Sequence, residues 1–173
     1  MCKPIKMVVK DNIITNTQLI KVEFLLMTFL LVLFPILLGP LETLDQRLFG
    51  YSLQETQYAL ETYGEEGRSR YYWVGLSLDT LLPVLYSLFF IQLFRTFHLK
   101  IDTRWKHLIH VLLCTPGLCD FIENRFIAHL LNTYPKIDSS TVYWASFFTQ
   151  IKFLSLSVTC ILLFITWQFV RRK

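Results

Sequence analysis

Four apolar segments, each long enough to cross a lipid bilayer as a helix, constrain this chain more than any other feature of its sequence. At about 1.5 Å of rise per residue, a helix of roughly 20 apolar residues spans the hydrocarbon core. The four segments are residues 22–41, 71–94, 108–131 and 142–170. Because 53% of all residues are hydrophobic, the composition also excludes an ordinary soluble domain of this size. The sequence therefore predicts an all-α integral membrane protein, a four-helix bundle that forms a single domain over residues 1–173.

The charges in the connecting loops predict the orientation of this bundle. Lys and Arg in short flanking loops favour the cytoplasmic side of a membrane. They gather before the first span, between the second and third spans, and after the fourth: Lys3, Lys6, Lys10, Lys21, Arg95, Lys100, Arg104, Lys106, Arg171, Arg172 and Lys173. The loop of residues 42–70 instead carries six acidic residues against three arginines. We therefore expect a multi-pass protein of the cell membrane with both termini cytoplasmic and an even number of spans.

The loop of residues 42–70 contains a signal for a short helix outside the membrane. Ser52 and Glu55 have the spacing of a capping box, and Gly64 is well placed to end a helix that runs to about Tyr63. The apolar residues that fall near one face of this helix are Leu53, Leu60 and Tyr63. The pattern predicts a short amphipathic helix between spans one and two, lying on the outer membrane surface or across the mouth of the bundle. A plain interfacial connector is the alternative.

Four ionisable side chains interrupt the apolar segments at nearly the same depth. Counted from the outer end of each span, Asp79 and Glu123 lie about 12 Å deep, Lys152 about 15 Å and Asp120 about 16 Å. Unrelated charges would have no reason to share one layer. Since a charge in hydrocarbon is costly, an intramembrane cluster of this kind is a hypothesis for a functional site.

Helical spacing gives each of these charges polar neighbours on its own helix face. Asp79 and Tyr86 are seven residues apart, and Asp120, Glu123 and Asn124 follow i, i+3, i+4 spacing. Such polar faces are expected to point into the bundle rather than toward lipid. Three carboxyl groups near one ammonium cannot all be ionised in a low dielectric, so at least one is expected to hold a proton. The predicted ligand or proton site comprises Asp79, Tyr86, Asp120, Glu123, Asn124 and Lys152.

Two short patterns in this region resemble those of a known group of proteins. They are Asp79-x-x-x-Pro83-x-x-Tyr86 and Asp120-x-x-Glu123-Asn124, preceded by the run Gly64-Glu65-Glu66-Gly67-Arg68. Together they resemble a group of small four-span bacterial membrane proteins with no assigned activity, over roughly residues 50–155. The resemblance implies the same span order and gives weight to the three acids, but it implies no activity.

Two classes of function fit these observations. The first is an intramembrane charged pocket that opens outward and binds a small polar or lipid headgroup ligand, or relays protons. Enzymatic chemistry on a lipid, with two carboxyls as general acid and base, would be a special case of it, and the sequence leaves open whether the protein is an enzyme. The second is a structural or accessory bundle, assembled with another membrane protein, in which the cluster only fixes helix packing.

Other partners are not indicated by the sequence. His107 and His110 have i, i+3 spacing but no partner pair of His or Cys, so interfacial packing is favoured over a metal site. No cofactor is expected. The formal net charge of +4 is explained by topology and anionic lipid headgroups, and no basic motif with interleaved aromatic residues favours nucleic acid.

Overall fold

The computed structural model describes residues 5–97, 99 and 102–172, with side chains from Thr17 onward. Lys3, Lys100 and Lys173, which the topology prediction uses, lie outside these residues, as do the side chains of Lys6 and Lys10. The described part of the chain is helical and contains no strand, which confirms the all-α prediction. Its elements in chain order are α1 (Ile5–Leu38), the short 3-10 helix η1 (Leu44–Gln46), α2 (Leu53–Thr96), α3 (Thr103–Thr133) and α4 (Ser139–Arg171).

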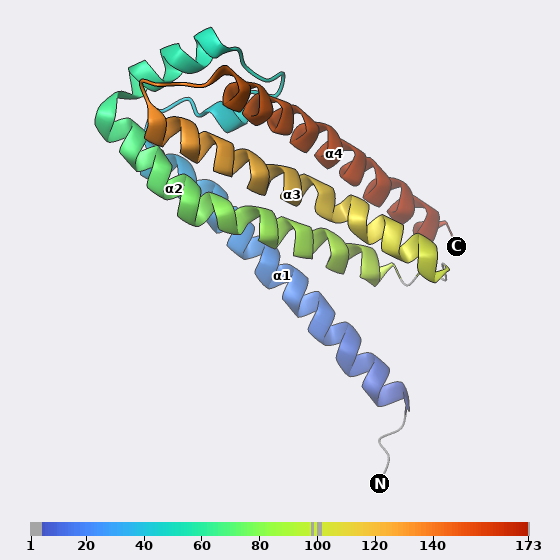
Figure 1. Cartoon of the computed structure of the whole chain (residues 1–173). Helices are drawn as coiled ribbons and strands as arrows, with labels where there is room; N and C mark the ends of the chain where they lie inside the picture. The colour runs from blue at the N-terminus through green and yellow to red at the C-terminus, as the bar shows by residue number, and fades with distance from the viewer. Residues whose placement is uncertain (1–4, 98, 100–101, 173) are drawn as a thin grey trace.

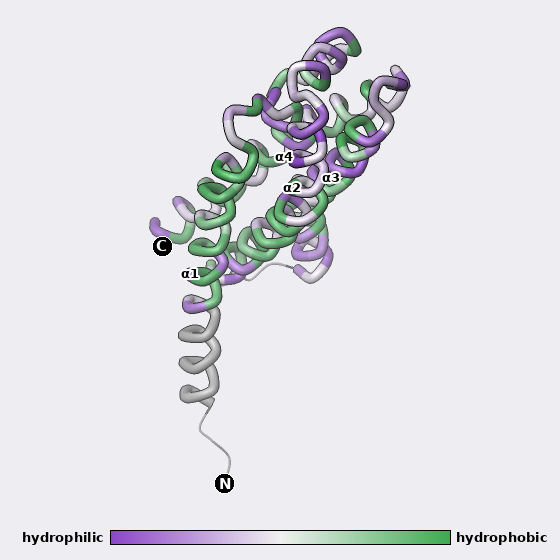
Figure 2. The backbone as a smooth tube through the Cα atoms, turned by 90° about the vertical axis from the view of Figure 1, so that its left-hand side faces the viewer, coloured by the Kyte–Doolittle hydropathy of each residue, from purple (hydrophilic) through white to green (hydrophobic). Residues whose placement is uncertain are grey.

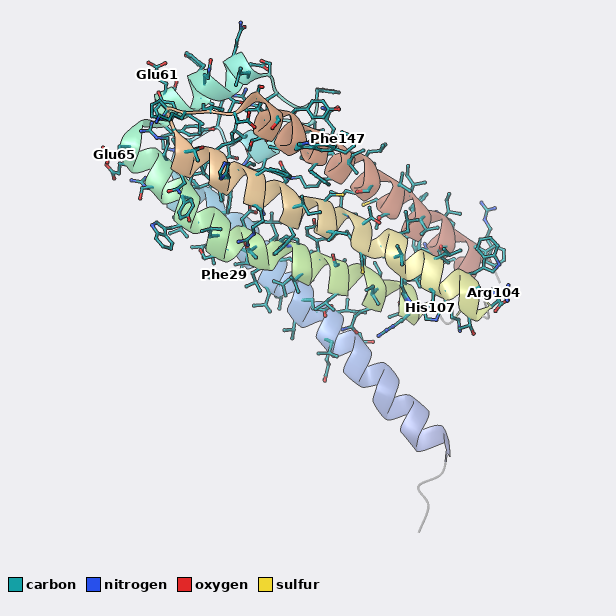
Figure 3. All side chains as sticks on the ribbon, viewed as in Figure 1. Phe29, Glu61, Glu65, Arg104, His107 and Phe147 are labelled. Carbon is teal, nitrogen blue, oxygen red and sulfur yellow. The ribbon has the colours of Figure 1, made fainter. Side chains whose placement is uncertain are left out.

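Three of the helices are long and apolar enough to cross a membrane. They are α1 over Thr17–Leu38, α2 and α4. The helix α3 is not among them, and its length includes Asp120, Glu123 and Arg125. Large apolar side chains on the outer surface of the bundle are exposed, among them Phe29 and Phe147, and Figures 2 and 3 show apolar residues along the helices. These features indicate a membrane protein, whereas a fourth span remains a prediction.

The helices α2, α3 and α4 pack side by side, and α1 packs mainly against α2 (Figure 1). The segment of residues 39–52, which includes η1, connects α1 to α2 across one end of the bundle, which we call the loop end. A cluster of buried residues fills this end and includes Leu38, Leu44, Leu60, Tyr63, Tyr71, Ile127, Leu130 and Val142. As a result η1 is held against the bundle, with Leu44 fully buried.

The residues of the predicted short helix form the first part of α2, whereas an amphipathic helix outside the membrane remains a prediction. Ser52 and Glu55 form the predicted capping box, in which the Glu55 amide donates to Ser52 Oγ and the Ser52 amide donates to Glu55 Oε2. The Ser52 amide and the Ser52 hydroxyl both donate to the Glu55 carboxylate, and these two bonds lower the pKa of Glu55 below its ordinary value. At Gly64 the backbone leaves the helical region, with φ 63° and ψ −179°, a conformation that is accessible almost only to glycine. The break therefore occurs where the sequence predicts it, and α2 continues from there into the long apolar helix.

The closest approach of α2 and α3 requires a glycine. A Cβ atom at Gly117 would lie 2.7 Å from the backbone carbonyl oxygen of Pro83 and would collide with Ser87 Oγ. A side chain at this position would force the two helices apart. By contrast, a Cβ atom at Gly75 on α2 would meet no atom within 4 Å.

We expect Gly117→Ala to destabilise the bundle by roughly 1–3 kcal/mol, because overpacking a tight contact displaces backbone. The matched variant Gly75→Ala should be neutral or slightly stabilising, since alanine favours the helix by about 1 kcal/mol over glycine where space allows. Thermal unfolding of both variants in the same detergent measures the difference. Equal effects at the two positions would contradict the close approach at Gly117.

Candidate functional site: a buried charge cluster beside an apolar cavity

The four charged residues that the sequence places at one depth come together in the structure. Asp79 on α2, Asp120 and Glu123 on α3, and Lys152 on α4 expose 5%, 6%, 0% and 7% of their surface. The prediction of one buried charge cluster is therefore confirmed.

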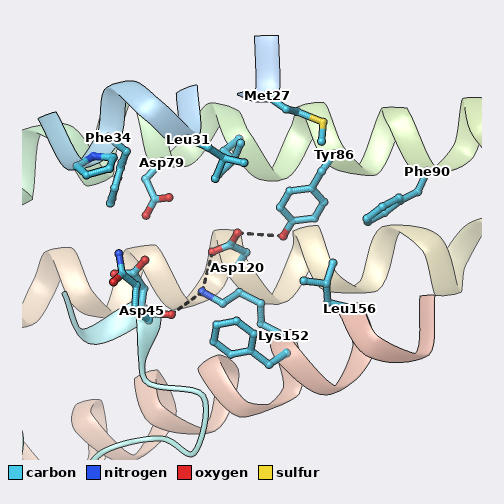
Figure 4. Close-up of a pocket in the computed structure, with 14 residues that line it drawn as sticks. Met27, Leu31, Phe34, Asp45, Asp79, Tyr86, Phe90, Asp120, Lys152 and Leu156 are labelled. Atoms are coloured by element: carbon cyan, nitrogen blue, oxygen red, sulfur yellow. Dashed lines mark hydrogen bonds and ion pairs between the residues drawn. The ribbon is translucent and has the colours of Figure 1, made fainter. Parts of the chain in front are cut away.

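Lys152 is the centre of the cluster. Its Nζ lies 2.7 Å from Glu123 Oε2 and 3.3 Å from Asp120 Oδ1. It also donates to the backbone carbonyl oxygen of Asp45 in η1, at 3.1 Å (Figure 4). One ammonium group thus connects the bundle helices α3 and α4 to the segment that crosses the loop end.

Uncharged side chains satisfy some of the remaining carboxylate oxygens. The Thr149 hydroxyl donates to Glu123 Oε1 at 2.5 Å, and the Tyr86 hydroxyl donates to Asp120 Oδ2 at 2.9 Å. Asn124 also bonds to a residue of the cluster, because its Nδ2 donates to the backbone carbonyl oxygen of Asp79 at 3.0 Å. Tyr86 thus contacts a carboxylate, whereas Asn124 contacts the backbone.

The Asp79 carboxylate differs from the other two. Its Oδ2 is buried, and no hydrogen-bond donor reaches it within the part of the chain that the structure describes. In Figure 4 the carboxylate points from α2 into the space that separates α1 and α2 from α3 and α4. Leaving a buried polar atom unpaired is costly, so such an atom calls for an explanation.

A fourth carboxyl group joins the cluster from outside the predicted spans. Asp45 of η1 is buried, and its Oδ1 accepts a hydrogen bond from the hydroxyl of the buried Tyr71, at 2.6 Å. In the sequence, Asp45 is only one of the six acids of the loop of residues 42–70. No spacing rule relates this loop residue to the helices, and the apolar Leu44 beside it is the only hint that the segment turns inward.

The cluster forms one end of a cavity of about 390 Å³. Asp45, Asp79, Asp120 and Lys152 line its polar end, whereas Glu123 is not in its wall. The rest of the wall is predominantly apolar and includes Met27, Leu31, Phe34, Leu82, Phe90, Phe153 and Leu156 (Figure 4). The cavity is thus amphipathic, because the charged side chains gather toward one end, where Phe34 also lies, and hydrocarbon side chains line the remainder.

The apolar wall extends to the outer surface of the bundle. Leu31 of α1 lines the cavity and is also 57% exposed. On the opposite side, Phe153 and Leu156 of α4 are only half-buried. Partly exposed residues of both α1 and α4 therefore line the cavity, and α1 packs mainly against α2.

Arg125 and the histidines of α3 do not extend the site. Arg125 lies on the exposed surface, where it donates to Thr80 Oγ1 at 2.8 Å, so it does not neutralise the cluster. Within the described residues no group of three or more His, Cys, Asp or Glu is arranged to hold a metal ion. His110 lies far along α3 from the acids, where it contacts the ring of Phe94.

Comparison with known proteins gives no relative for this chain: no family model, no curated protein and no solved structure matches it. The resemblance to small bacterial four-span proteins therefore stays a prediction. The chemistry of the site has to be argued from its own residues.

Proposed function

We propose that this protein is a four-span membrane protein, with both termini cytoplasmic, that binds an amphiphilic ligand within the bilayer. The polar part of the ligand contacts the charge cluster, and its apolar part occupies the space between Met27 and Leu156. The observation that supports this proposal is the amphipathic cavity of about 390 Å³, a size typical of small-molecule sites. A closed structural cluster would need no such space beside it.

The ligand would enter from the bilayer, between α1 and α4. Asp45 and Gln46 of η1 line the loop end of the cavity, and the partly exposed wall residues lie on the two helices instead. An apolar mouth of this kind suits a molecule that is already dissolved in lipid. A direct opening to the outer solution, as the sequence suggests, stays a prediction.

A structural role for the cluster is the second candidate. It is favoured by the three bonds of Lys152, which connect η1, α3 and α4. In this case the bundle would serve as an accessory to another membrane protein, and the cavity would take up ordinary lipid chains without preference.

Saturable capture of an alkyl photoprobe distinguishes these two candidates. The protein is reconstituted in nanodiscs with a trace of an alkyl amphiphile that bears a diazirine, and crosslinks are mapped with and without excess unlabelled amphiphile. We expect saturable crosslinks to Met27 and Leu156. Replacing Leu156 with Trp fills the cavity and should abolish them, whereas Leu154→Trp, on the lipid-facing side of the same helix, should not. Crosslinks that do not saturate, or that both variants reduce equally, would favour the structural role.

The proposed topology is tested by cysteine accessibility. In a variant whose four native cysteines are replaced with serine, a cysteine is placed at Ser52 or at Thr103. A membrane-impermeant maleimide added outside intact cells should modify the probe at position 52 and not the one at position 103, because the segment that contains Ser52 is acidic and the one before Thr103 is basic. Modification of position 103 alone would reverse the topology.

A further inference from the structure

We infer that the polar part of the bound ligand is a protonated amine, with Asp79 as the carboxylate that binds it. This inference rests on the proposed function and specifies its ligand class. It follows from the charges around the cavity, the unpaired oxygen of Asp79, the aromatic residues of the wall and the apolar remainder of the cavity.

The charges around the polar end are out of balance. Four buried carboxyl groups, those of Asp45, Asp79, Asp120 and Glu123, surround the single ammonium group of Lys152. Lys152 makes its shortest contact with Glu123, which lies outside the cavity wall. Lys152 therefore neutralises the acids that face the cavity only in part. A ligand with a positive charge would balance them.

Asp79 is the group at which that missing charge would bind. The other two acids of the wall already have donors: Asp45 accepts from Tyr71, and Asp120 accepts from Tyr86 and Lys152. Asp79 Oδ2 has none within the described residues, although its side chain is buried and directed into the cavity. A buried carboxylate requires either a proton or a cation with N–H donors. A protonated amine supplies both the charge and the donor.

Aromatic rings beside the acids suit an organic cation. Tyr86 and Phe90 are adjacent along the cavity wall, with ring centroids 5.8 Å apart, and Lys152 Nζ already lies 5.1 Å from the centroid of the Phe153 ring. The negative face of an aromatic ring attracts ammonium groups. The site is less suited to a metal ion, since the described acids are not arranged as a set of metal ligands.

The apolar remainder of the cavity determines what the amine is attached to. A small inorganic cation or a free polyamine would leave Met27, Leu31 and Leu156 without a partner. An alkyl chain of a single-chain amine would cover these side chains, and its amine end would reach Asp79. The chemical class is thus a long-chain primary amine, present in the bilayer as its ammonium form.

Three probes with the same chain and different head groups test this inference: dodecylammonium, 1-dodecanol and dodecanoate. Their equilibrium binding to the protein in zwitterionic nanodiscs is measured at pH 7 and corrected for partition into empty nanodiscs. We expect saturable binding of one dodecylammonium per protein, at least tenfold tighter than that of dodecanol, and weaker binding still of dodecanoate. Asp79→Asn should remove the preference for the amine, so that dodecylammonium and dodecanol bind with similar affinity. Glu61→Gln, which removes an exposed acid from the loop end, is the matched control and should change nothing.

The outcomes separate this inference from the proposed function. Saturable binding without preference for the amine, or a preference that survives in Asp79→Asn, would overturn the inference and leave the proposed function intact. Saturable binding of none of the three probes would overturn both. Thermal unfolding and size-exclusion profiles establish that Asp79→Asn is folded, and Asp79→Glu, which retains the charge, should retain the preference for the amine.

Discussion

Replacing Lys152 with methionine is expected to destabilise the bundle by about 3–5 kcal/mol, the cost typical of deleting one partner of a buried ion pair. Lys152 is the only ammonium within reach of Asp120 and Glu123, at 3.3 and 2.7 Å, in the described part of the chain. Without it, two carboxylates lose their cation, and the Asp45 carbonyl oxygen loses a donor. Methionine has nearly the length of lysine, so the loss is electrostatic rather than a loss of packing.

Asp79→Asn should cost much less and provides the comparison. The Asp79 carboxylate has an unpaired oxygen, so an amide of the same shape removes a buried charge without breaking a bond to it. The Asn124 side chain can still donate to the backbone at position 79, because that contact does not involve the side chain. Thermal stability in detergent ranks the two variants directly. Equal losses, or a larger loss in Asp79→Asn, would mean that Lys152 is not the essential counter-ion of the cluster.

The sequence predicts those structural features that follow from the position of a residue along one helix. The rise per residue places Asp79, Asp120, Glu123 and Lys152 at one depth, and the structure brings all four into one buried cluster. The capping box at Ser52 and the break at Gly64 are equally local, because each depends on residues at most four positions apart.

Other parts depend on contacts between distant segments, which periodicity does not encode. Asp45 reaches Lys152 and Tyr71 only because η1 is held against the end of the bundle, across 107 and 26 positions of the sequence. The cavity likewise arises because α1 packs mainly against α2 and leaves space beside α4. The unpaired oxygen of Asp79 is likewise not encoded by periodicity, since the hydroxyl donors Tyr71 and Tyr86 bond to Asp45 and Asp120 instead.

Substitutions of Glu123 and Lys152 should have non-additive effects on the free energy of unfolding, because these two residues form the shortest ion pair of the cluster. Glu123→Leu alone is expected to cost about 3 kcal/mol, at the lower end of the range for a broken buried pair, because Lys152 keeps Asp120 as a partner. The Thr149 hydroxyl adds little to this cost, since it can still donate to the Ala145 carbonyl oxygen, 3.0 Å away. The variant that carries both Glu123→Leu and Lys152→Met should then be more stable than the sum of the two losses implies, by about 0.5–3 kcal/mol.

The matched control for this cycle pairs Lys152→Met with Glu61→Gln, an exposed and distant site, where the two effects should add to within about 0.5 kcal/mol. Full additivity in the Glu123 cycle as well would show that the 2.7 Å contact is energetically unimportant. Comparing the single variants Glu123→Leu and Asp79→Asn separates packing from binding, because Glu123 lies outside the cavity wall, whereas Asp79 lies within it. If the cluster binds an amine through Asp79, then Glu123→Leu should strongly reduce thermal stability and change amine affinity little. Asp79→Asn should strongly reduce amine affinity and change thermal stability little.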